Sequence, residues 1–166
     1  KRLSKRNAAT SIEDYRDQGY LDSAILNTLA RLGWSKGEND VFYMDDLIKN
    51  FNIKDVQKAG AIFDVTKLDW LNSQHMSDLS DDAYRSKLKP FLEKLDIEID
   101  DHQNTKILLE SMRTSANTFY GVAQSLIPYF KEIETYDIKA VKKFIKNKDI
   151  LSDLKSILVK LKDWSE

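Results

Sequence analysis

The sequence predicts a mostly helical protein, and three observations lead to this prediction. The chain has only 5 glycines and 2 prolines in 166 residues, about 4%, where an average domain has about 12%. Hydrophobic residues make up 42%, enough for a core. They recur at three- and four-residue intervals, the period of an amphipathic helix. The length fits about one domain, in which a small part with room for short strands precedes an all-helical part.

Two helices are predicted near the start. Ser11 and Asp14 have the spacing of a capping box, and Gly19 supplies a left-handed stop after this helix. A second helix follows and ends at Gly33. Its apolar stripe consists of Leu21, Ala24, Ile25, Leu29 and Leu32.

The next part of the chain alternates between helical and irregular segments. Residues 41–43 predict either a short strand or the approach to a helix over 45–51. Residues 56–62 read as irregular. Asp64 then caps a helix that carries Leu68, Trp70 and Leu71 on its way to a boundary near 76–80.

The second half reads as helical throughout. Ser77 or Ser80 begins a helix that runs through Leu88 to Leu95. The next helical pattern covers 101–126, with a break near Ser115 and a disturbance at Pro128.

Two further helices are expected over 138–146 and 150–162. The second has an apolar stripe that we expect to enter the core. This stripe consists of Leu151, Leu154, Leu158 and Leu161.

Composition excludes several kinds of site. The chain has no cysteine, which excludes disulfides and thiolate metal sites and fits a reducing cytoplasm. We expect its two histidines, His75 and His102, at the surface, and we predict no metal site. No apolar run approaches the roughly 18 residues of a membrane span, so we expect no membrane partner. The net charge of −1 gives no bulk attraction to nucleic acid.

Two local clusters of positive charge remain as candidate binding sites. Residues 2–6 (RLSKR) can hold a polyphosphate, because Lys and Arg bind phosphate oxygens and Ser donates a hydrogen bond; the alternative is a frayed basic terminus. The second cluster can follow an RNA backbone from one helix face, or it is an ordinary solvated face. It consists of Lys139, Lys142, Lys143 and Lys146.

A short loop and four ordered blocks after it resemble the bacterial glutamyl-tRNA synthetase family of class I. The loop at 2–6 is similar to the family's K-L-S-K-R signature. Residues 15–21 (YRDQGYL) and 26–35 (LNTLARLGWS) follow in the family's order. They are succeeded by 63–72 (FDVTKLDWLN) and, at the end, by 163–166 (DWSE).

The resemblance implies a role for each part. Residues 1–10 would be the tail of the catalytic domain, 11–76 a stem-contact subdomain, and 77–166 an incomplete helical anticodon-binding subdomain. ATP, bound with Mg²⁺ in the parent enzyme, would be held by Arg2, Ser4, Lys5 and Arg6. Lys5 matches the catalytic lysine that stabilises charge during adenylate formation. The family's other ATP signature and its amino-acid pocket have no counterpart here, so we expect a trimmed piece that is inactive and without ATP by itself.

One difference from the family concerns tRNA specificity. The family commonly reads E-R-x-K-T-L in a helix that faces the anticodon, and Ser115 stands in place of that arginine. Arg113 would point about 200° away on such a helix. We hypothesise that the parent enzyme also charges glutamine tRNA. The alternative is a neutral substitution or a misplaced register.

The sequence therefore predicts part of a cytoplasmic, monomeric glutamate–tRNA ligase whose partners are tRNA and, through the missing catalytic domain, ATP and glutamate. Two alternatives remain. One is a piece of glutaminyl-tRNA synthetase, whose anticodon-binding part in that family is built of β-barrels. The other is a non-catalytic helical interaction module.

Overall fold

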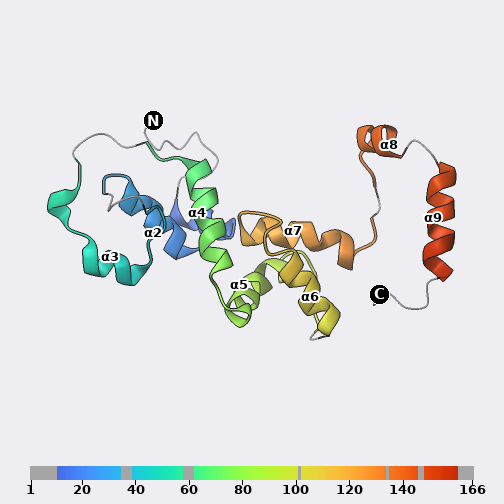
Figure 1. The fold of residues 1–166 in the computed structure, drawn as a ribbon, viewed down its shortest axis with the longest axis horizontal. Helices are drawn as coiled ribbons and strands as arrows, with labels where there is room; N and C mark the ends of the chain where they lie inside the picture. The colour runs from blue at the N-terminus through green and yellow to red at the C-terminus, as the bar shows by residue number, and fades with distance from the viewer. Residues whose placement is uncertain are drawn as a thin grey trace. The chain divides into compact units, whose positions relative to one another are not determined.

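The structure, a computed structural model, describes residues 11–34, 39–57, 62–100, 102–133, 135–145 and 148–160. Across these residues it contains nine α-helices, one 3₁₀-helix and no strand, which confirms the mostly helical fold (Figure 1). The chain divides into two compact units, Lys1–Lys131 and Glu132–Glu166, and each is described by itself. The predicted domain boundary near 76–80 falls within the first unit and stays a prediction.

The first part of unit 1 follows the sequence pattern closely. Ser11 and Asp14 form the predicted capping box, and Gly19 has a φ of 86°. Residues 41–43 form no strand and lead into the next helix, so the second of the two interpretations is correct. Asp64 caps its helix as expected, by accepting from the Thr66 amide at 2.9 Å. The elements are α1 (Ile12–Asp17), α2 (Asp22–Arg31), α3 (Met44–Asn50), η1 (Ile53–Asp55) and α4 (Val65–Ser77).

The second part of unit 1 contains α5 (Asp81–Glu93), α6 (Gln103–Ser111) and α7 (Phe119–Phe130). Ser80 caps α5, and the predicted break near Ser115 separates α6 from α7. Pro128 does not interrupt α7, which continues to Phe130. A proline this close to the end of a helix removes a backbone hydrogen bond only in the last turns.

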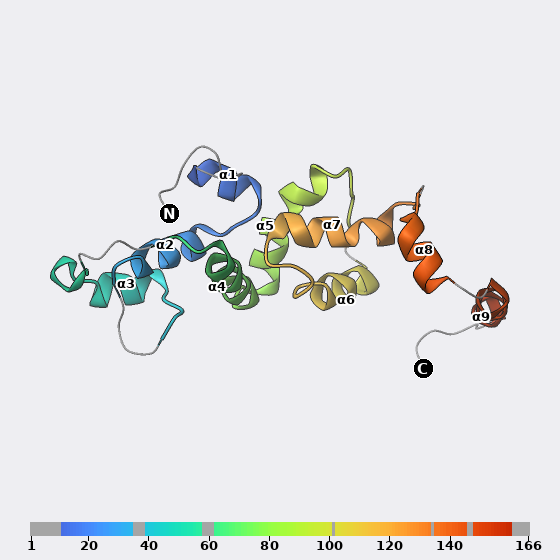
Figure 2. The same cartoon turned by 90° about the horizontal axis from the view of Figure 1, so that it is seen from above.

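A main core joins α1, α2, α4, α5, α6 and α7 of unit 1, and a second, smaller cluster consists of Trp34, Phe42 and Leu47. α2 packs against α4 and α5 packs against α7 (Figure 2). Leu29, expected in the apolar stripe of α2, is instead 41% exposed. Its side chain lines an open groove together with Leu47 and Ile48 of α3. The fully buried apolar side chains include Leu68, Leu71, Leu88, Phe119, Val122 and Leu126.

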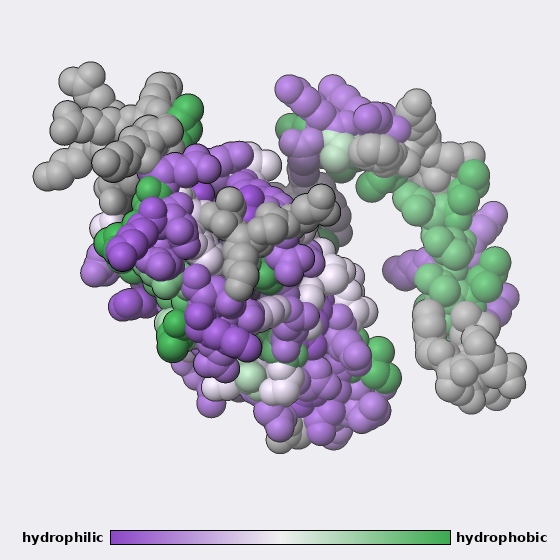
Figure 3. Space-filling view, turned by 60° about the vertical axis from the view of Figure 1, so that its left-hand side comes forward, coloured by the Kyte–Doolittle hydropathy of each residue, from purple (hydrophilic) through white to green (hydrophobic). Residues whose placement is uncertain are grey.

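Unit 2 contains α8 (Ile138–Phe144) and α9 (Lys148–Lys160). The prediction that the leucines of α9 enter a core is wrong for Leu151 and Leu154, which are 44% and 48% exposed. Leu161 lies outside the described residues. Figure 3 shows hydrophobic side chains at the surface of this helix. The stripe is amphipathic as predicted, but no other described element of unit 2 covers it.

A candidate nucleic-acid interface

The predicted site residues fall into three groups. Arg2, Ser4, Lys5 and Arg6 lie outside the described residues, and so does Lys146. Arg113 and Ser115 lie in the turn between α6 and α7, which we call the 112–118 turn. Lys139, Lys142 and Lys143 lie on α8 in unit 2. The structure therefore keeps the lysines in one helix and places the other two candidates together in unit 1.

The 112–118 turn exposes Ser115 to solvent. The Ser115 amide donates to the Met112 carbonyl at 3.0 Å, which closes the first bend. The Thr118 hydroxyl then caps α7 by accepting from the Gly121 amide at 3.1 Å. Our expectation that Arg113 and Ser115 occupy one helix is therefore wrong, because this segment is a turn whose residues do not follow helical spacing.

Arg113 holds the corner between α4 and α5. Its side chain is only 15% exposed. Nη1 donates to Asp81 Oδ1 at 3.1 Å, and Nη2 donates to the carbonyls of Met76, at 3.2 Å, and Leu79. The guanidinium also lies 4.6 Å from the centre of the Tyr84 ring. These contacts satisfy carbonyls at the end of α4, so both terminal nitrogens of the Arg113 guanidinium bind within the chain.

The far end of the 112–118 turn is held by residues from the other half of unit 1. Asn72, fully buried on α4, donates from Nδ2 to the Asn117 carbonyl at 2.6 Å and accepts the Leu21 amide at Oδ1 at 2.8 Å. The Gly19 carbonyl accepts from the Phe119 amide at 3.1 Å. The turn is therefore fixed at both ends, which presents Ser115 from a rigid support.

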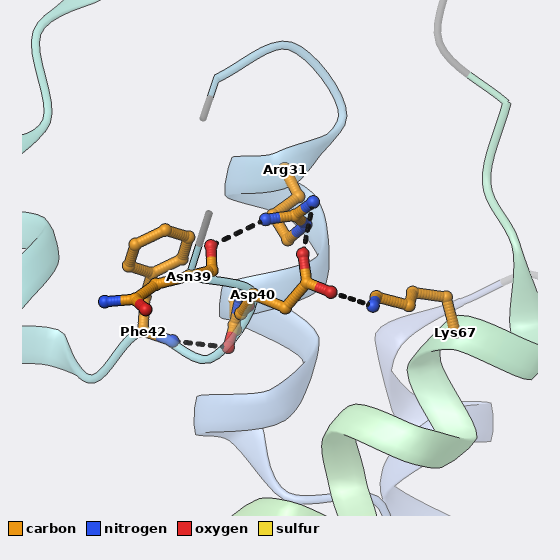
Figure 4. Close-up of polar contacts among 6 residues, drawn as sticks. Arg31, Asn39, Asp40, Phe42 and Lys67 are labelled. Atoms are coloured by element: carbon orange, nitrogen blue, oxygen red, sulfur yellow. Dashed lines mark hydrogen bonds and ion pairs between the residues drawn. The ribbon is translucent and has the colours of Figure 1, made fainter. Parts of the chain in front are cut away.

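An ion cluster joins α2 to α4 (Figure 4). The Asp40 carboxylate pairs with Arg31 at 2.5 Å and with Lys67 on α4. Arg31 also donates to the Asn39 carbonyl at 3.0 Å. The hydrogen bond from Lys67, with the charge of Arg31, holds the pKa of Asp40 below its usual range. Both cations are thus used to fasten the segment before α3.

A buried polar contact lies beside this cluster. Asn27 Oδ1 accepts from the Phe42 amide at 2.8 Å and faces His75 Nε2 at 3.1 Å. His75 is 3% exposed, so our expectation of a surface position is wrong. Burial lowers the pKa of His75, which favours the neutral ring. The signal was present in the sequence, because His75 follows Leu68, Leu71 and Asn72 at helical spacing on one stripe.

The lysines of α8 form the other candidate surface. Lys139, Lys142 and Lys143 are exposed, and their three- and four-residue spacing places them on one side of the helix. Asp137 caps α8 by accepting from the Ala140 amide at 2.7 Å. Such a row of ammonium groups suits the phosphates of an RNA backbone.

Comparisons with known proteins agree on one family. Residues 1–70 match the family model described as tRNA synthetases class I (E and Q), catalytic domain. Glutamate–tRNA ligase 1 of Syntrophus aciditrophicus is 37% identical over 99% of this chain and 35% of its own length. The corresponding ligase of Ruthia magnifica is 36% identical over 98% of this chain and 36% of its own length.

Solved structures give the same result. A glutamate–tRNA ligase from Elizabethkingia meningosepticum, in complex with its amino acid, superposes with a TM-score of 0.77 at 28% identity. The match covers 96% of this chain and 32% of that one. The glutamate–tRNA synthetase of Elizabethkingia anophelis gives 0.73 at 29% identity, over 96% and 31%. The chain therefore spans about a third of the length of the relatives it matches.

Proposed function

We propose that this chain, a member of the glutamate–tRNA ligase family of class I tRNA synthetases, is the part of such an enzyme that binds tRNA and supplies the loop that binds the phosphates of ATP. The observation that carries this proposal is 37% identity over 99% of the chain to a glutamate–tRNA ligase. The contacts in unit 1 support it, because residues of the blocks at 15–21, 26–35 and 63–72 pair with one another. Examples are the contacts of Asn72 with Leu21 and of His75, just beyond its block, with Asn27.

The parent reaction would activate glutamate with ATP and then transfer it to tRNA. Arg2, Ser4, Lys5 and Arg6 would bind the ATP phosphates, and Mg²⁺ would arrive with ATP as part of the substrate. Lys5 would stabilise the charge that develops as adenylate and pyrophosphate separate. Residues 11–76 would contact the tRNA stem and residues 77–166 the anticodon region. We further propose that the enzyme works as a monomer in the cytoplasm.

Lys5 gives the sharpest test of the ATP loop. In the whole enzyme, Lys5→Met should lower the rate of glutamate-dependent ATP–pyrophosphate exchange by about 100-fold or more, the usual cost of removing one group that stabilises the transition state. Lys54→Met, at an exposed position in η1, is the control and should leave the rate unchanged. Exchange at the parent rate by the 166-residue chain alone would contradict the assignment of adenylate chemistry to the rest of the enzyme.

Ser115 carries the proposal on specificity. An arginine that favours the glutamate anticodon is replaced here by a short, exposed hydroxyl on the 112–118 turn. We propose that the enzyme charges both glutamate and glutamine tRNA, and that Ser115→Arg shifts the kcat/KM ratio toward glutamate tRNA. Thr114→Arg, at the neighbouring exposed position, is the control. Strict rejection of glutamine tRNA by the parent enzyme would refute this proposal.

Two other functions are disfavoured. A glutaminyl-tRNA synthetase of the β-barrel type does not fit the described residues of 77–160, which contain helices and no strand. A helical interaction module would be indifferent to tRNA, so a measurement of tRNA binding distinguishes it from the proposed function.

We expect the binding of tRNA to weaken as the salt concentration rises. Lys139→Gln and Lys142→Gln should each lower the slope of log K against log salt by about 0.7 to 0.9.

A further inference from the structure

A small polar cavity lies between α5 and α6 in unit 1. Its volume is about 170 Å³, and Arg113 at the start of the 112–118 turn lines one side of it. Tyr84 and Arg85 line it from α5, and Gln103 and Lys106 line it from α6. The cavity is well above the roughly 30 Å³ that one water molecule occupies in the liquid. It is also distinct from the exposed position of Ser115.

Two polar atoms of the residues that line this cavity lack a partner. Among the residues that the structure describes, neither the Tyr84 hydroxyl nor Arg113 Nε has a hydrogen-bond partner, and both atoms are buried. Tyr84 as a whole is 2% exposed. Buried polar groups are almost always hydrogen-bonded, because an unpaired group loses its hydrogen bonds to water and gains none in the protein. Both residues line this one cavity, so a ligand bound in it lies next to the two side chains whose buried donors lack a partner within the described chain.

The charge around the cavity favours an anion. Three cations line it, Arg85, Lys106 and Arg113, against the carboxylates of Asp81 and Glu110. Asp81 already pairs with Arg113. Arg85 and Lys106 form no ion pair with any side chain in the described part of the chain. Burial raises the pKa of Tyr84 to about 12, so its hydroxyl remains a donor at neutral pH.

We propose that this cavity binds a phosphate group. Its lining offers hydrogen-bond donors from Tyr84, Arg85, Lys106 and Arg113, and phosphate has four oxygens that accept hydrogen bonds. An apolar ligand would leave the two buried donors unpaired, and a metal cation is disfavoured because three positive side chains outnumber the two carboxylates, one of which already pairs with Arg113. The phosphate has two possible sources, a backbone phosphodiester of bound RNA or free phosphate. Only the RNA source rests on the proposed function.

Phosphate titration tests the site directly. We would add inorganic phosphate to the 166-residue chain at constant ionic strength and follow the ³¹P resonance. Tyr84→Phe and Lys106→Gln should each weaken binding about tenfold or more, the loss expected for one hydrogen bond to a charged group. Lys87→Gln is the matched control, because Lys87 lies on α5 but lines a different groove. Equal binding by all four proteins would overturn the proposal.

Tyr84→Phe also separates a ligand role from a structural one. Because the hydroxyl has no partner within the described chain, its removal should leave the thermal midpoint without phosphate unchanged or slightly higher. The rise of the midpoint on adding phosphate should shrink. A variant that unfolds more easily without phosphate would show that the hydroxyl is used inside the protein, and would overturn its assignment to the site.

Binding of tRNA distinguishes the two sources. If an RNA phosphodiester occupies the cavity, Lys106→Gln should lower the salt slope for tRNA by about 0.7 to 0.9, and phosphate should compete with tRNA. If tRNA binding is unchanged while phosphate binding is lost, the site holds free phosphate. If the chain binds phosphate but no tRNA at all, the phosphate site stands and the proposed function fails.

Discussion

Asn72 illustrates how single side chains organise this molecule. Its amide lies at full burial between two segments, and it uses both of its polar atoms, one on the Leu21 amide and one on the Asn117 carbonyl. Aspartate could accept but not donate, and leucine could do neither. Asn72 and Leu21 belong to the sequence blocks that resemble a tRNA synthetase. Their hydrogen bonds therefore help to hold the 112–118 turn in position.

Gly19 is required for two separate reasons. Its φ of 86° is a left-handed conformation, and a Cβ there would lie 2.7 Å from the Phe119 amide nitrogen. Gly19→Ala should therefore lower the free energy of unfolding by about 2 kcal/mol or more, measured by urea titration. Gly33→Ala is the control, because Gly33 has no left-handed φ and the closest contact of its Cβ would be with the Val56 side chain, with Gln57 backbone atoms at 3.5 Å and beyond. Equal losses for the two variants would contradict the backbone argument.

His75 should make stability depend on pH. Its pKa is lowered by burial in the folded protein and near 6.5 in the unfolded chain. The unfolded chain therefore takes up the proton first, so stability is complete above pH 6.5 and declines below it, by at most about 1.4 kcal/mol per pH unit. Urea titrations between pH 7.5 and 5.5 should show this decline in the parent protein.

Two variants identify the source of that decline. His75→Gln should remove the pH dependence between 6.5 and 5.5, whereas His102→Gln should retain it, because the His102 side chain is 82% exposed. A decline of the same size in His75→Gln as in the parent protein would rule out His75 as its cause.

At the scale of elements, the corner between α4 and α5 depends on Arg113. Arg113→Met removes the donors to Asp81 and to the carbonyls of Met76 and Leu79. We expect a loss of about 2 to 4 kcal/mol in the free energy of unfolding, since the Leu79 carbonyl and the Asp81 carboxylate lose the guanidinium that pairs with them. Arg16→Met, at an exposed position on α1, should change it by less than about 0.5 kcal/mol. A loss that small for Arg113→Met would show that the corner holds without the guanidinium.

Local signals predicted the elements well because they act within a few residues. The capping box at Ser11, the left-handed Gly19 and the caps at Asp64 and Ser80 are all present. Pro128 was misjudged because the cost of a proline depends on how close the helix end is, which tertiary packing decides.

The site was harder to predict, because its residues meet across long separations in the chain. Arg113 reaches Asp81, and Tyr84, whose buried hydroxyl has no partner among the described residues, lines a cavity together with residues of α6. Neither residue belongs to a sequence motif, and both look like ordinary helix residues. His75 is a different case, because its spacing from Leu68, Leu71 and Asn72 indicates a buried position, and only its partner Asn27, 48 positions earlier, is out of reach of local patterns.

At the scale of the whole molecule, stability is distributed unevenly between the two units. Among the residues of unit 2 whose side chains the structure describes, none is fully buried, and only Val141 and Leu158 are partly buried. The buried apolar side chains all belong to unit 1. An apolar stripe such as that of α9 indicates a helix but not its partner, so the sequence could not show whether the stripe is covered.

This distribution predicts how each unit responds to loss of an apolar side chain. Leu126→Ala, at a fully buried position on α7, should lower the free energy of unfolding of unit 1 by about 2 to 5 kcal/mol. Leu154→Ala on α9, where the side chain is 48% exposed, should change the free energy of unfolding by less than about 0.5 kcal/mol. Hydrogen exchange followed by mass spectrometry should also show faster exchange in α9 than in α7, because helices with few buried contacts open locally. Equal protection of the two helices, with a large loss for Leu154→Ala, would mean that α9 is covered in solution and that its leucines do serve a core.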